Sequence, residues 1–136
     1  MRITTPGIQP NKNSSWRPNQ GKGFMESRLI YISNEKLKPL LKWPLINDSE
    51  WEYFGAEFEA DKKLVEITIN NYFEDDQLYI AHKRNDSFKC YKNDVMAAVE
   101  TLLGFENFII WNISFDRAIE FNSIGVFRRG KSIGTI

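Results

Sequence analysis

The segment that decides the fold class is Leu64–Tyr91, which reads LVEITINNYFEDDQLYIAHKRNDSFKCY. In residues 64–70, β-branched and other apolar side chains alternate with polar ones, which is typical of a strand with one face in water. Two further strand-like runs, Gln77–Lys83 and Phe88–Tyr91, are separated from it and from each other by short polar turns. The segment therefore predicts three successive strands in an antiparallel meander.

On the N-terminal side of this segment, the sequence predicts one strand and two helices. Arg28–Ile32 is rich in β-branched and aromatic residues and favours a strand. A short helix over Glu35–Lys42 follows, limited by Pro39. A second helix begins at Glu50, after the capping residues 47–49. Its apolar face, at helical spacing, would be Trp51, Phe54, Gly55 and Phe58.

On the C-terminal side, the clearest helix starts at Asn93 and Asp94 and ends before Gly104. Asn107–Asn112 is apolar on both faces, as expected of a central strand. Ser114 is expected to cap a last helix, and Val126–Arg129 to form an edge strand. The predicted fold class is α+β: one mainly antiparallel sheet with helices packed against it, in the order βααβββαβαβ.

The charges divide the chain into two unlike parts. Residues 1–25 carry four basic residues and no acid, whereas the remainder carries the other 14 Lys and Arg against all 18 acids. We expect a flexible basic arm over 1–24, because its Pro, Gly, Asn and Ser residues bury little apolar surface. A single domain over 25–130 and a frayed tail over 131–136 complete the predicted organisation. The arm could instead grip phosphates, but its four charges are scattered.

No motif in the chain predicts a reaction, a cofactor or a metal site. His82, the only histidine, alternates with Leu78 and Ile80, which favours a structural role over general-base chemistry. Cys90 has no partner for an internal disulfide and is expected to be a buried thiol rather than a nucleophile, in a reducing compartment. Without a signal peptide or a long apolar run, we expect a cytoplasmic protein that binds neither membrane nor nucleic acid.

The remaining signal is the distribution of acidic residues, which we expect to form one negative surface with an aromatic residue at its edge. Such a surface would attract a basic protein and steer its association. The alternative is an acidic solvated face without a function. The predicted partner-binding residues are Glu50, Trp51, Glu52, Glu57, Glu59, Asp61, Glu66, Glu74, Asp75 and Asp76.

In general character, residues 26–130 resemble the immunity proteins of bacterial polymorphic-toxin and contact-dependent inhibition systems. The features that carry this resemblance are the cytosolic character of the chain, the absence of catalytic motifs, the acidic segment Glu50–Asp61, and the expected core around Tyr31–Leu37 and Asn107–Trp111. The resemblance implies a non-enzymatic protein that neutralises a basic toxin domain by stoichiometric masking.

Two other hypotheses remain open at this stage. The chain could be a structural or regulatory module, encoded by a phage or mobile element, that acts through oligomerisation. It could also be an enzyme that uses His82 with a carboxylate.

Overall fold

The computed structural model describes residues 23–133, and these residues form a single α+β domain, which confirms the predicted fold class. Its α-helices are α1 (Gly23–Leu37), α2 (Lys62–Tyr72) and α3 (Val95–Val99), with 3₁₀ turns η1 (Lys38–Leu40), η2 (Glu57–Glu59) and η3 (Lys92–Asp94). The element order differs from the predicted one, because several of the predicted segments adopt the other kind of structure.

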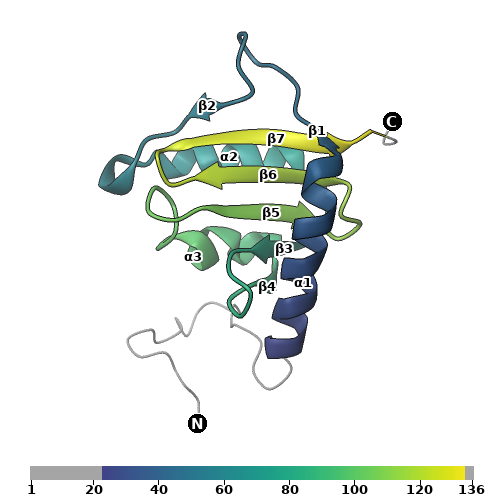
Figure 1. The fold of residues 1–136 in the computed structure, drawn as a ribbon. Coiled ribbons are helices and arrows are strands. Elements are labelled where there is room, and N and C mark those ends of the chain that lie inside the picture. The colour runs from purple at the N-terminus through teal and green to yellow at the C-terminus, as the bar shows by residue number, and fades with distance from the viewer. Residues whose placement is uncertain (1–22, 134–136) are drawn as a thin grey trace.

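The strands form one antiparallel sheet (Figure 1). Along the main path the order is β1-β7-β6-β5-β3-β4, and β2 also pairs with β7. The strands are β1 (Leu41–Lys42), β2 (Glu52–Tyr53), β3 (Gln77–Ala81), β4 (Phe88–Tyr91), β5 (Phe108–Asn112), β6 (Arg117–Asn122) and β7 (Val126–Ser132).

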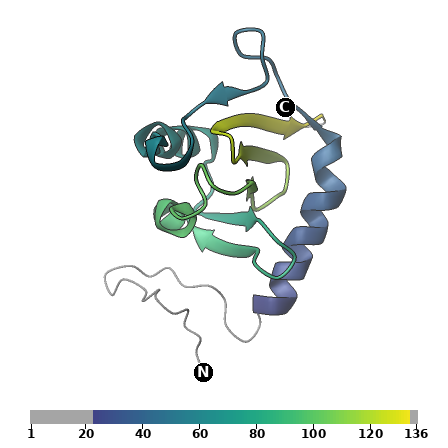
Figure 2. The same cartoon turned by 60° about the vertical axis from the view of Figure 1, so that its left-hand side comes forward.

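The helices cover both faces of the sheet (Figure 2). On one face, α2 and α3 enclose the larger core, where Val65 and Val99 meet Ile80, Ile110 and Phe121. On the other face α1 crosses the strands, and a smaller cluster forms around Trp111. The alternation of side chains along each strand supplies apolar groups to both cores. The middle strand β5 is therefore buried at every position.

The strand predicted over 28–32 is wrong, because this segment lies inside α1. The residues that α1 turns towards the sheet are Ser27, Ile30, Asn34 and Leu37, a spacing of three to four residues. Two of these four are polar and find specific partners. Ser27 Oγ donates to the Arg84 carbonyl at 2.8 Å, and Asn34 accepts from the Trp111 indole at 2.9 Å. Because Ser27 and Asn34 are polar, the spacing of apolar residues alone does not reveal the helix.

The strand predicted over 64–70 is also wrong, because α2 occupies this segment. Asp61 caps the helix by accepting a hydrogen bond from Leu64 N at 3.0 Å. Val65, Thr68 and Ile69 are buried, whereas Ile67 is half exposed, so the helical period wins over the alternating one. The predicted meander therefore reduces to the β3–β4 hairpin, and the second partner of β3 is β5.

Neither helix predicted between residues 35 and 59 forms as expected. Residues 35–37 end α1, Pro39 lies in η1, and the chain then becomes extended as β1. Residues 50–59 contain the strand β2 and the single turn η2. Pairing of β2 with β7 keeps the first half extended, and Gly55, with φ +103°, redirects the chain before η2.

In the C-terminal half, a helix after Asn93 and the central strand β5 are confirmed, although α3 ends at Val99 instead of continuing to Gly104. The helix predicted after Ser114 is wrong. Asn112 Oδ1 accepts hydrogen bonds from the backbone N–H groups of Asp116 and Arg117, both at 3.0 Å, and this turn leads directly into β6.

β7 is not the predicted edge strand, because it pairs with β6 on one side and with β1 and β2 on the other. It continues through Lys131 and Ser132, where a frayed tail was predicted. The rest of that tail, 134–136, and residues 1–22 of the predicted arm 1–24 lie outside the described residues, whereas residues 23 and 24 belong to α1.

Candidate functional site

Three of the predicted partner-binding residues contact β7 instead of forming a free acidic surface. Glu50 and Glu52 form ion pairs with Arg128 and Arg129, the second at 2.7 Å. The indole of Trp51 lies against the Arg128 guanidinium, 4.6 Å from its ring centroid. These side chains therefore hold the 43–53 segment onto the sheet.

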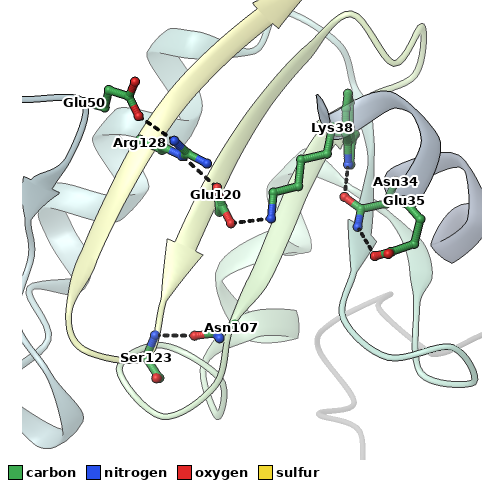
Figure 3. A network of polar contacts seen from close by, with 9 residues as sticks. Asn34, Glu35, Lys38, Glu50, Asn107, Glu120, Ser123 and Arg128 are labelled. Atoms are coloured by element: carbon green, nitrogen blue, oxygen red, sulfur yellow. Dashed lines mark hydrogen bonds and ion pairs between the residues drawn. The ribbon is translucent and has the colours of Figure 1, made fainter. Parts of the chain in front are cut away.

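Arg128 is the centre of this network (Figure 3). Its guanidinium also stacks on Trp43, 3.9 Å from the ring centroid, and its Nε donates to Glu120 at 2.8 Å. Lys38 approaches the other oxygen of Glu120 at 2.8 Å. Only 18% of the Arg128 side chain is exposed, so the charge is compensated by carboxylates and by two aromatic faces. The network therefore contributes to the stability of the domain.

The other predicted acids are spread along α2 rather than gathered on one surface. Asp61 is the N-cap of α2, and Glu66 is exposed on the helix. Residues 74–76 follow the C-terminus of α2, where Asp75 accepts a hydrogen bond from Ile113 N at 3.3 Å. Eleven residues of helix separate this segment from Asp61, a length of ~16 Å. The structure thus brings Glu57 and Glu59 together but leaves 74–76 apart from them.

Glu57 and Glu59 belong to a surface at one end of the sheet, on the left in Figure 1. Here the η2 loop lies beside the connection from α3 to β5 and the turn from β6 to β7. Glu57 N donates to the Gly104 carbonyl at 3.1 Å, and Phe54 N and Gly55 N both donate to the Gly125 carbonyl. Ser123 N donates to Asn107 Oδ1 at 2.7 Å. We call residues 55–59, 104–107 and 123–125 the loop end.

Glycines make the close approach of these loops possible. A Cβ at Gly104 would lie 2.4 Å from Glu57 N, and one at Gly125 would lie 2.7 Å from the carbonyl carbon of Gly55. Both glycines also have positive φ angles, which other L-residues rarely adopt. Below the loops, Phe54 packs against the buried rings of Phe121 and Phe127. The loop end is therefore built by backbone hydrogen bonds over an aromatic core.

The loop end exposes large apolar side chains. Phe58 is 94% exposed, Phe105 45% and Ile124 69%. The Phe58 and Phe105 rings meet edge to face, with their centroids 5.3 Å apart. The acids of the loop end are Glu57, Glu59 and Glu106, and its three segments contain no Lys or Arg. An apolar patch whose own segments carry only acidic charges has the composition of a surface for a basic, partly apolar partner.

The sequence analysis named Glu57 and Glu59 but missed the apolar part of the loop end. Phe58 was assigned to the buried face of a helix that does not form. Phe105 and Ile124 each stand next to a glycine in a turn, as Gly104-Phe105 and Ile124-Gly125. A large apolar residue beside a turn glycine was the available signal, because tight turns lie at the surface.

His82 and Cys90 have surroundings that match structural roles. His82 Nε2 lies 3.2 Å from Glu106, and no other side-chain hydrogen bond to this imidazole occurs within residues 23–133. The nearby Ser87 hydroxyl donates to the Lys83 carbonyl at 2.8 Å and accepts from His82 N. Cys90 is a buried free thiol. Burial, and secondarily Asp94, raises its pKa from 9.0 to about 12, which keeps it protonated at neutral pH.

No protein-family model, curated protein or solved structure matches this chain. In the described part of the chain, no helix combines the length and the apolar character needed to cross a membrane. Within the same residues, no three potential metal-ligating side chains of His, Cys, Asp or Glu converge.

Proposed function

We propose that this chain is a non-enzymatic protein-binding module that binds a basic protein through its loop end. The observation that carries the proposal is the exposed Phe58–Phe105 pair within a surface whose charged side chains are all carboxylates. Aromatic residues dominate the energy of protein interfaces, and complementary charges steer the encounter. A preassembled loop surface loses little entropy on binding, which favours a stable complex.

The particular form of this function that we propose is that of an immunity protein: a cytoplasmic protein that neutralises a bacterial toxin domain by stoichiometric masking. Support comes from the general resemblance of residues 26–130 to such proteins and from the negative charge of the folded body. Carboxylates at the loop end would pair with the Lys and Arg residues that the toxin uses to bind its own substrate. Glu57 and Glu59 are the two predicted residues best placed for this role.

The test is a pull-down of the purified full chain with the product of the gene next to its own, read by native mass spectrometry. The expected result is a 1:1 complex whose dissociation increases with salt, because screening weakens contacts between exposed charges. A stable homo-oligomer that captures no such protein would contradict the proposal and favour the oligomeric structural or regulatory module. Light scattering on the isolated chain distinguishes a monomer, which the proposal predicts, from a homo-oligomer.

A further inference from the structure

The Phe58 ring is the most exposed aromatic group among residues whose exposure the structure describes. Its contact with Phe105 is edge to face, with an interplanar angle of 71°, so the two rings do not stack and hide each other. Glu57 and Glu59 flank Phe58 in the chain and are themselves exposed. The loop end thus offers an aromatic face and two carboxylates within three successive residues.

This combination of groups fits a guanidinium better than an ammonium. A guanidinium is planar and weakly hydrated, and it can stack on an aromatic ring while its N–H groups, which point outwards in its own plane, bind carboxylates. An ammonium is more strongly hydrated and provides a point charge without a flat face. A neutral apolar group would use the ring but leave the carboxylates without a partner.

The chain itself shows this arrangement with an arginine in place. Arg128 stacks on Trp43 and Trp51 while Glu50 and Glu120 bind its N–H groups. A second arginine, Arg117, lies over Tyr72, 5.5 Å from the ring centroid. In these two places the cation comes from β6 or β7. The loop end has the aromatic ring and the carboxylates, but none of its own residues supplies the cation.

We infer that the partner's anchor at the loop end is an arginine, whose guanidinium stacks on Phe58 and is bound by the carboxylates of Glu57 and Glu59. This inference rests on the proposed function, because it names the group through which the basic partner docks. It also assigns different roles within the loop end: Phe58 provides the face, the two glutamates provide the charge, and Phe105 supports the ring from its edge.

The experiment uses three blocked peptides as probes: acetyl-Gly-Arg-Gly-amide and its Lys and Leu counterparts. Each is titrated into the full chain carrying labelled Phe and Tyr, at constant ionic strength, and ring signals are followed by NMR. Variants Phe58→Leu and Glu57→Gln/Glu59→Gln separate the aromatic and charged contributions. Tyr53, an exposed aromatic residue outside the loop end, is the internal control.

The expected result is that the Arg peptide shifts the Phe58 and Phe105 signals and binds ~2–5-fold more tightly than the Lys peptide, as a cation–π contact at an exposed site provides. Phe58→Leu and the double Gln variant should each lower the affinity for the Arg peptide by a similar factor. The Tyr53 ring signals should not shift in any titration. Equal binding of the three peptides, or unchanged Arg binding in either variant, would overturn the inference.

The peptide experiment is independent of the natural partner, so the two proposals can fail separately. A 1:1 complex in the pull-down together with no preference for the Arg peptide would overturn the arginine anchor and leave the proposed function standing. A preference for the Arg peptide that depends on Phe58 would support the anchor even if the neighbouring gene product does not bind.

Discussion

Replacement of Gly104 by Ala should disrupt the loop end and lower the free energy of unfolding by about 2–3 kcal/mol. The new Cβ would lie 2.4 Å from Glu57 N and 3.1 Å from the Ala56 carbonyl carbon, both backbone atoms that cannot turn away. The φ angle of +81° costs an L-residue ~1–2 kcal/mol. Loss of the hydrogen bond from Glu57 N to the Gly104 carbonyl adds about 1 kcal/mol.

Urea unfolding followed by circular dichroism measures this change, and the melting temperature should fall by about 10 °C. Gly104→Asn is the informative comparison, because Asn tolerates a positive φ but has the same Cβ. Asn should therefore recover only part of the cost of the positive φ and remain destabilised by at least ~1 kcal/mol, because its Cβ makes the same close contact and the hydrogen bond is still lost. A loss below ~0.5 kcal/mol for Ala, or stability largely recovered with Asn, would refute the close packing of the loops.

Three further predictions concern the rest of the domain. Arg128→Met should lower the free energy of unfolding by ~3 kcal/mol, because Glu120 loses a half-buried partner. It should also change the tryptophan fluorescence, because two indoles lose a stacked cation. A loss of stability under ~1 kcal/mol would refute the role of the network. Cys90 should not react with Ellman's reagent at pH 8 in the folded protein. Because burial raises its pKa to about 12, the unfolded chain loses this proton first, so stability should fall as pH rises from 9.0 towards 12. Cys90→Ala should flatten that decline, and an unchanged slope would contradict it. Tyr72→Phe removes the 2.7 Å hydrogen bond to the Gly130 carbonyl and should cost ~1 kcal/mol. Burial also raises the pKa of Tyr72, so ultraviolet titration should lose a late-ionising tyrosine in this variant.

The sequence predicted well those elements whose local pattern and tertiary role agree. The hairpin of β3 and β4 follows from two strand-like runs around a polar turn, and both strands form within the predicted limits. β5 was recognised as central because every residue in Phe108–Trp111 is apolar, and all of them are buried. In α3 the buried residues Val95, Ala98 and Val99 have plain helical spacing.

The prediction failed where tertiary contacts select one of two possible periods. In α2, alternation of Val65, Ile67 and Ile69 suggested a strand, but Thr68 is buried and donates from Oγ1 to the Leu64 carbonyl at 2.8 Å. A threonine that satisfies its hydroxyl in this way counts as part of the buried face. In α1, Asn34 is likewise part of the buried face, because its side-chain oxygen accepts a hydrogen bond from the indole of Trp111, 77 residues further along the chain.

The candidate site was only partly predictable for a related reason. Acidic residues near one another in sequence were expected to share a surface. Glu50 and Glu52, however, form ion pairs with arginines that lie 78 and 77 residues away. No local pattern reveals such pairs. Glu57 and Glu59 flank Phe58 in an exposed turn, where the Phe58 and Phe105 rings meet, rather than lying on an acidic helix face.

The measurement that tests the central claim most directly is the affinity of the partner protein for the Phe58→Ala variant, compared with its affinity for the Leu29→Ala variant. Both residues are exposed, but Leu29 lies on α1, away from the loop end, so neither change should alter stability by more than ~0.5 kcal/mol. Calorimetry with the co-purified partner should show that Phe58→Ala raises the dissociation constant by at least ~30-fold, which is about 2 kcal/mol of binding free energy, as expected of an interface anchor. Leu29→Ala should bind as the parent chain does. Equal affinities for the two variants would contradict the loop end as the binding surface.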